Sequence, residues 1–219
     1  MNLSDRLRND AAPIWKKIFE HPFVVELYKG DLPLEKFKFY LLQDYHYLIA
    51  AMKNFSIIAS KAPTVESMKE VIDILNLEAT SEFEGYEELL KRLGYTLADA
   101  AEIDPMPMNI SYSSFLLTTS SLKSYAEAMA AVLPCFWSYA EIASHHRESL
   151  KTNKIQLYKD WGNVYLTDSY LSLVEKIRTL VNKAGEECPY GKLKSVFMAA
   201  SRYEFLFWEA VYYKQEWPI

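Results

Sequence analysis

The stretch 123-KSYAEAMAAVLPCFWSYAEIASHHRES-149 decides the fold class. Apolar residues recur in it at spacings of three and four, which is the period of an α-helix and not of a strand. Its longest uncharged apolar run, Ala128–Ala140, is shorter than the roughly 20 residues that a helix needs to cross a bilayer. The stretch therefore predicts a long, buried helix in a protein that does not span a membrane.

The composition supports a large core and excludes several classes of partner. Half of the 219 residues are hydrophobic and 15% are aromatic, which excludes a chain that is disordered throughout. The 24 basic and 29 acidic side chains give a net charge of −5, and no basic block is present. Phosphate contacts need clustered Lys and Arg, so we expect no nucleic-acid partner.

The cysteines and the N-terminus bear on the compartment. Cys135 and Cys188 are too few for a disulfide framework, and free thiols fit a reducing cytosol. The first ten residues, MNLSDRLRND, are charged throughout and lack the apolar region of a signal peptide. We therefore expect a cytoplasmic protein.

The rest of the chain also has helical periodicity, and no segment alternates like a strand. A proline-containing loop is expected at Ile103–Met108. No linker rich in Gly, Ser or Pro divides the chain, so we expect one all-α helical bundle over residues 1–219. The expected helices are Leu3–Phe19, Pro33 to just before Pro63, Thr64–Leu93, Ile110–Ser120, Lys123–Ser149, Gln156–Val164, Asp168–Ala184 and Gly191–Lys214.

Polar residues on apolar stripes are the most informative feature for function. Glu204 lies on the same helical face as a set of apolar residues, and Asp44 lies between Leu41 and Leu48 in the same way. Cys135 lies on the apolar stripe of the 123–149 helix. The apolar residues that share a face with Glu204 are Leu193, Phe197, Ala200, Trp208 and Val211. Two carboxylates and a thiol are thus expected to face inward from three helices.

These inward-facing groups allow two interpretations. Asp44 and Glu204 could accept hydrogen bonds from core side chains and only specify packing, because a buried carboxylate without a partner is costly. Alternatively, they could line a polar cavity for a small molecule, which the many tyrosines favour. Cys135 could likewise be a small buried hydrophobe, although Pro134 beside it removes a backbone N–H and could open room for a ligand.

Metal and nucleotide motifs are missing from the sequence. There is no GxGxxG, no P-loop, no HExxH and no CxxC. A di-iron bundle would place Glu three residues before His on two helices, and none of the four histidines has this pattern. Glu141 precedes His145 by four residues, which is a weak signal on its own. We expect no metal site.

Three segments together resemble the TenA family, the thiaminase II type of aminopyrimidine aminohydrolase. They are HPFVVELYKGDLPLEKFKFYLLQDYHYL at 21–48, VLPCFWSYAEI at 132–142 and SRYEFLFWEAVYY at 201–213, and they occur in family order. The resemblance covers nearly the whole chain. It implies an all-α fold similar to haem oxygenase, a homotetramer and no cofactor.

The resemblance also implies site residues. Cys135, Glu204 and Asp44 correspond to the catalytic positions, and Cys135 places the chain in the branch that contains this cysteine. The implied substrate-binding residues are Asp44, Tyr47, Tyr112, Tyr139, Tyr165 and Phe207. Glu209 matches no functional position of the family.

The implied reaction is hydrolysis of an aminopyrimidine at its 5-methylene group, with Cys135 as the nucleophile and the carboxylates as acid–base groups. A small-molecule aminopyrimidine is therefore the expected partner. Two other classes stay open at this point. One is a non-catalytic pyrimidine-binding or regulatory protein, and the other is a haem or di-iron oxygenase on the same fold.

Overall fold

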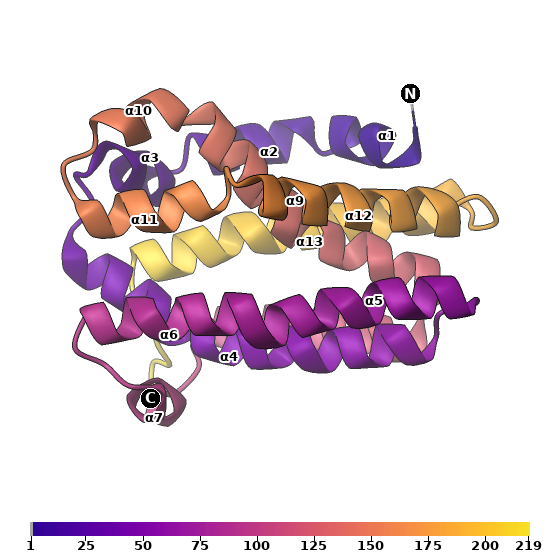
Figure 1. Ribbon diagram of the computed structural model, residues 1–219, viewed down its shortest axis with the longest axis horizontal. Helices are drawn as coiled ribbons and strands as arrows, with labels where there is room; N and C mark the ends of the chain where they lie inside the picture. The colour runs from indigo at the N-terminus through magenta and orange to yellow at the C-terminus, as the bar shows by residue number, and fades with distance from the viewer. Residues whose placement is uncertain (1) are drawn as a thin grey trace. The chain divides into compact units, whose positions relative to one another are not determined.

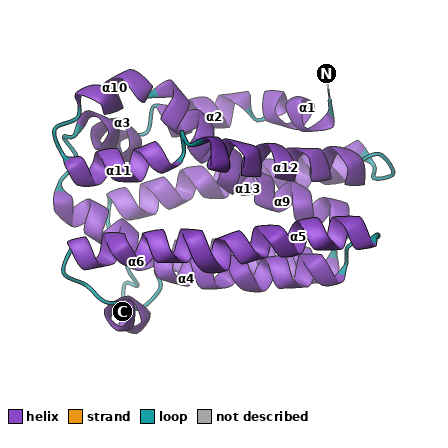
Figure 2. Cartoon of the chain, viewed as in Figure 1, coloured by secondary structure: helices purple, strands orange, loops and turns teal. Residues whose placement is uncertain are grey.

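Helices account for every regular element that the structure contains. The computed structural model describes residues 2–219, and no strand occurs in that range (Figures 1 and 2). The prediction of an all-α protein is confirmed. None of the helices in the described range is both long and apolar enough to span a bilayer.

The chain divides into two compact units that alternate along the sequence. The first unit comprises the residues up to Leu32 together with Ala126–Glu209, and the second comprises Pro33–Tyr125 together with Ala210–Ile219. Each unit is described separately below.

The first unit contains most of α9, which carries Cys135, and most of α13, which carries Glu204. Helix α9 extends into the second unit by one residue and α13 by three residues. The helices are α1 (Leu3–Asp10), α2 (Ala12–Phe19), α3 (Pro22–Lys29), α9 (Tyr125–His145), α10 (Arg147–Thr152), α11 (Gln156–Val164), α12 (Asp168–Ala184) and α13 (Tyr190–Tyr212).

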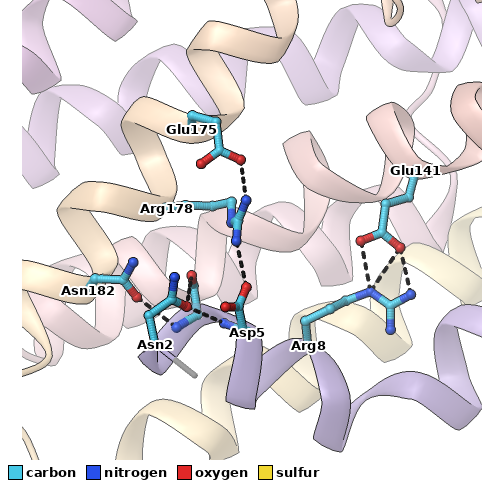
Figure 3. Close-up of polar contacts among 8 residues, drawn as sticks. Asn2, Asp5, Arg8, Glu141, Glu175, Arg178 and Asn182 are labelled. Carbon is cyan, nitrogen blue, oxygen red and sulfur yellow. Dashed lines mark hydrogen bonds and ion pairs between the residues drawn. The ribbon is translucent and has the colours of Figure 1, made fainter.

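Charged groups fix α1 to its neighbours in this unit. Arg178 of α12 pairs with Asp5 of α1 at 2.6 Å and also with Glu175, and its guanidinium lies over the ring of Trp137. Arg8 forms a two-pronged ion pair with Glu141 of α9 (Figure 3). Such bidentate pairs have a defined geometry, so they hold the N-terminal helix at one position along α9 and α12.

The predicted helix Leu3–Phe19 is wrong as a single helix. The structure divides it at Ala11, and Pro13 lies in the first turn of α2, where its missing N–H costs nothing. The side chain of Asn2 caps α1 by accepting the N–H of Asp5.

The predicted helix Lys123–Ser149 also divides in the structure. Helix α9 continues through Pro134 but ends at His145, and α10 begins at Arg147. The ring of His146 lies at this break, and its Nε2 donates to the carbonyl of Phe19 at 2.8 Å.

The second unit is built around α4. The neighbours that pack on α4 are α5, the π-helical turn η1, α6, α7 and α8. Their bounds are α4 (Leu34–Ser60), α5 (Val65–Leu77), η1 (Glu78–Glu82), α6 (Phe83–Arg92), α7 (Leu97–Glu102) and α8 (Pro107–Leu122). Helix α7 and, in the first unit, α3 were not predicted, because both are short and apolar periodicity is weak over six to eight residues.

The expected helix Thr64–Leu93 has the predicted ends and an unexpected middle. Thr64 caps it through a reciprocal pair with Ser67, and Gly94 follows its end with φ of +82°, in the left-handed region. Between them the helix widens into a π-turn over Glu78–Glu82. Such turns inside helices are frequent at functional sites.

Candidate active site

Cys135 and Tyr139 lie one turn apart on α9 and therefore share a face of that helix. Both side chains are partly buried, and Cys135 forms no disulfide. The Tyr139 ring lies 4.9 Å from the ring of Tyr165 and 5.4 Å from that of Trp208. The structure thus brings the cysteine-bearing face of α9 together with Tyr165, at the end of α11, and with α13.

Aromatic rings from three helices surround this face. Trp161 contacts both Tyr139 and Tyr165, at 6.0 Å and 4.9 Å between ring centroids. Tyr170 of α12 contacts Tyr165 at 5.0 Å and donates its hydroxyl to the carbonyl of Phe136 at 3.0 Å. The edge-on arrangement of these rings restricts their rotation, so the tyrosine hydroxyls are held in place by packing.

Glu204 is buried as its apolar stripe predicted. It is 4% exposed and lies on α13 one turn before Trp208, the residue that contacts Tyr139. Phe207 is buried beside it and packs edge-on against Trp208. A buried carboxylate on the face that meets α9 can hold or release a proton in low-dielectric surroundings.

Glu209 has a structural partner instead. Its carboxylate accepts from Nε2 of His21 at 3.3 Å, while Nδ1 of that ring accepts the N–H of Phe23 and caps α3. Burial lowers the pKa of His21, and the charge of Glu209 opposes this shift only in part.

The second unit holds the other three predicted residues. Asp44 and Tyr47 lie one turn apart on α4, and both are partly buried. Tyr112 lies on α8, is buried, and has its ring 5.4 Å from that of Tyr47. Asp44, Tyr47 and Tyr112 are thus brought to one region of the α4–α8 pair.

A second pair of carboxylates, which the sequence reasoning missed, accompanies Asp44. Glu78 of the π-turn is 7% exposed, and η1 packs on α4. Burial raises the pKa of Glu78 well above its ordinary value, and the nearby charges of Glu82 and Asp44 raise it further. Burial likewise raises the pKa of Glu82. Asp44 therefore lies among acidic groups whose ionisation is disfavoured by burial and, for Glu78, also by the charges of its neighbours.

Tyr86 of α6 lies next to the part of α4 that carries Asp44. Its hydroxyl donates to the carbonyl of Leu41 at 3.0 Å, and its ring contacts that of Tyr45. Burial and then the charge of Asp44 raise the pKa of Tyr86, so it stays a hydrogen-bond donor across the physiological range.

Metal-ligating side chains do not gather in the part of the chain that the structure describes. No group of three His, Cys, Asp or Glu side chains in residues 2–219 is arranged to hold a metal ion. The candidate residues described above supply a thiol, carboxyl groups and tyrosine hydroxyls.

Comparison with known proteins decides the family. The sequence model of the TENA/THI-4/PQQC family matches residues 8–214. The chain belongs to the TENA/THI-4/PQQC family. The resemblance noted in the three sequence segments is confirmed.

Three bacterial members of this family resemble the chain over its whole length, and each is named aminopyrimidine aminohydrolase. The protein of Helicobacter pylori is 30% identical, and the match covers 97% of this chain and 99% of that protein. The proteins of Bacillus subtilis and Halalkalibacterium halodurans are 29% and 28% identical, over 99% of this chain and 92% and 98% of theirs.

Solved structures place the fold within the family. A structure described as a TenA homologue protein from P. horikoshii OT3 is 45% identical with a TM-score of 0.94, and the match covers 97% of this chain and 99% of that one. A domain with a heme oxygenase-like fold from Shewanella denitrificans, 14% identical over 98% of this chain and 93% of that one, has a TM-score of 0.79. The second comparison confirms the predicted likeness of fold to haem oxygenase.

Proposed function

We propose that this protein is an aminopyrimidine aminohydrolase of the thiaminase II type that works in thiamin salvage. The observation that carries this proposal is the full-length similarity to three relatives with that name. The buried Glu204, the partly buried Cys135 and Asp44, and the surrounding tyrosines support it, because they supply the groups that the reaction needs.

The reaction replaces the group on the 5-methylene of a 4-amino-2-methylpyrimidine with a hydroxyl. The Cys135 thiolate adds to ring carbon C6, and the electron pair displaced from the ring expels the amine or thiazolium leaving group from the methylene carbon. Water then adds to the resulting exocyclic methylene, and the C6–S bond breaks to return the thiolate and the aromatic ring. One difficult displacement is thereby divided into two easier steps.

Acid–base chemistry accompanies both steps. Glu204 protonates the ring or the leaving group and later accepts a proton from the attacking water. Asp44 binds the edge formed by the amino group and the neighbouring ring nitrogen. Tyr47, Tyr112, Tyr139 and Tyr165 orient the ring through hydrogen bonds, and Phe207 stacks on it.

The decisive experiment is steady-state turnover by the purified protein. It uses 4-amino-5-aminomethyl-2-methylpyrimidine and thiamin side by side, and each reaction is followed to 4-amino-5-hydroxymethyl-2-methylpyrimidine. Turnover of either substrate supports the proposal. Tight binding without turnover would instead indicate a pyrimidine carrier or regulator, and an absorption spectrum with metal analysis tests for an oxygenase.

The setting of the enzyme belongs to the same proposal. Both units act together as one TenA-like domain over residues 1–219, in the cytoplasm, where Cys135 and Cys188, which form no disulfide, stay reduced. The chain forms a homotetramer with dihedral symmetry, the common arrangement of four subunits. Light scattering should return about 100 kDa, four times the 25.4 kDa of one chain. A mass near that of one chain at micromolar concentration would refute the tetramer.

A further inference from the structure

The segment between α7 and α8 cannot satisfy its own backbone. Ile103 and Met106 both have extended backbone conformations, and Pro105 and Pro107 have no N–H to donate. The segment makes neither a helical nor a sheet hydrogen-bond pattern. Its carbonyl and N–H groups therefore need side-chain partners if they are to be buried.

One buried side chain satisfies two of these groups. The amide of Gln43, which is 1% exposed, donates from Nε2 to the carbonyl of Asp104 at 3.0 Å. Its Oε1 accepts the N–H of Met106 at 2.8 Å. A side-chain amide carries a donor NH₂ and an acceptor oxygen on the same carbon, so Gln43 matches the segment on both sides.

Two further contacts complete the attachment. Nε2 of His46 lies 2.6 Å from the carbonyl of Ile103, and since a carbonyl only accepts, His46 donates. In return, Nδ2 of Asn109, in the first turn of α8, donates to the backbone carbonyl of Gln43 at 2.6 Å. Asn109 is also buried. These bonds fix the position of α8 along α4.

The candidate substrate-binding residues lie one turn beyond these bonds. Tyr47 follows Gln43 by four residues and Tyr112 follows Asn109 by three, so the Tyr47–Tyr112 contact repeats the Gln43–Asn109 contact one turn further along both helices. Asp44 is the next residue after Gln43. A shift of α8 along α4 at Gln43 would therefore misplace Asp44, Tyr47 and Tyr112 relative to one another.

We propose that Gln43 is a positioning residue that holds the 103–106 segment and the start of α8 so that Asp44, Tyr47 and Tyr112 meet the pyrimidine in register. This inference rests on the proposed function for its catalytic consequence. Gln43 itself need not touch the substrate. Its replacement should weaken pyrimidine binding more than it slows the chemical steps assigned to Cys135 and Glu204.

The test compares Gln43→Leu with a matched control, Asn54→Leu. Asn54 lies on the same helix and is equally buried, and its Oδ1 has no hydrogen-bond partner among the described residues. For Gln43→Leu we expect KM for the aminomethylpyrimidine to rise about tenfold or more, with kcat falling less than about threefold. Amide hydrogen exchange should accelerate over residues 103–112. Asn54→Leu should change neither quantity.

Gln43→Glu is the conservative variant and covers the case in which Gln43→Leu does not fold. Its carboxylate still accepts the N–H of Met106 but cannot donate to the carbonyl of Asp104, so KM should lie between those of the parent and Gln43→Leu. A folded Gln43→Leu or Gln43→Glu protein with unchanged KM overturns the proposal. Equal losses in Gln43→Leu and Asn54→Leu also overturn it, because they would reflect general destabilisation.

Failure of the proposed function gives a different result. The parent protein would then show no turnover, and the same variants would be compared by exchange over residues 103–112 and by calorimetric binding of 4-amino-5-hydroxymethyl-2-methylpyrimidine. Weaker binding together with faster exchange in Gln43→Leu would still support its positioning role. Unchanged binding would refute that role.

Discussion

The two units hold their candidate residues by different means. In the first unit, Tyr139 lies one turn after Cys135, and its ring and that of Tyr165 belong to a group of aromatic rings whose contacts are mostly edge-on. In the second unit, Asp44 lies beside buried acids, and hydrogen bonds from Gln43 fix the neighbouring segment. Packing thus orients the tyrosines near the proposed nucleophile, whereas hydrogen bonds and charge orient the proposed recognition residues.

This difference predicts a graded response to substitution. The nucleophile is a single atom that no other group replaces, so its removal should abolish nearly all turnover. Substrate recognition is shared among several hydrogen bonds. Removal of one of them should therefore weaken binding only in part, by an amount that depends on pH or on a neighbouring bond.

The largest effect is expected at Cys135. Cys135→Ser is nearly isosteric, but a serine hydroxyl is a far weaker nucleophile near neutral pH than a thiol. Turnover should fall by about 10³-fold or more, equivalent to roughly 4 kcal/mol at the transition state. Binding of the hydroxymethyl product, measured by calorimetry, should survive.

Cys188→Ser is the matched control, since Cys188 is also a free, partly buried thiol and follows α12 in a loop. It should keep near-normal activity. If the folded Cys135→Ser protein binds pyrimidine and its turnover lies within about tenfold of that of the parent, Cys135 is not the nucleophile. Glu204 and water would then have to carry the reaction.

The next largest effect is expected at Asp44. The carboxylate can accept both from the amino group of the substrate and from a proton on the adjacent ring nitrogen. Asp44→Asn leaves one donor facing another donor, which should cost roughly 2–4 kcal/mol in kcat/KM. The matched control is Asp31→Asn, on an exposed loop of the other unit. An unchanged kcat/KM in a folded Asp44→Asn protein would show that Asp44 contributes to packing and not to substrate recognition.

A smaller effect, on stability instead of activity, is expected at Glu78. The pKa of Glu78 is raised in the folded protein, so the folded state holds this proton more tightly than the unfolded chain does. The folded protein therefore loses stability as the pH rises above the pKa that Glu78 has in the unfolded chain. Glu78→Gln removes this penalty. Above pH 7 the variant should be more stable than the parent, because its amide carries no charge to bury.

The pH dependence gives the test its sign. The advantage of Glu78→Gln in urea unfolding should shrink as the pH falls toward about 4, where the parent carboxyl is protonated in both states. Glu84→Gln on the exposed face of α6 is the control and should show no such trend. A variant less stable than the parent at pH 8 would show that the charge of Glu78 stabilises the fold, which would contradict the raised pKa.

The sequence predicted the features that depend on local periodicity. Helices α11 and α12 begin and end at the predicted residues, and Glu204 is buried because it lies on a continuous apolar stripe. The cap at Thr64 was visible as a polar residue before a periodic segment.

The features it missed depend on tertiary contacts. Glu78 and Glu82 look like ordinary charged positions of a surface helix, and only the packing of η1 on α4 buries Glu78. Gln43 was part of a recognised motif but had no predicted role, because its partners Asp104 and Met106 lie about sixty residues away along the chain. A spacing pattern carries no information about such distant backbone groups.

The smallest effect is expected at Trp217, which holds the same segment as Gln43 but from the C-terminal tail. Its Nε1 donates to the carbonyl of Pro105 at 3.1 Å, and its side chain is about half exposed. Water can replace this bond in Trp217→Phe, whereas no water replaces the bonds of the buried Gln43 amide. The loss should be about 0.5 kcal/mol in stability, with KM for the aminomethylpyrimidine changing less than about twofold. An increase in KM as large as that of Gln43→Leu would show that the tail, and not the buried amide alone, sets the position of the 103–106 segment.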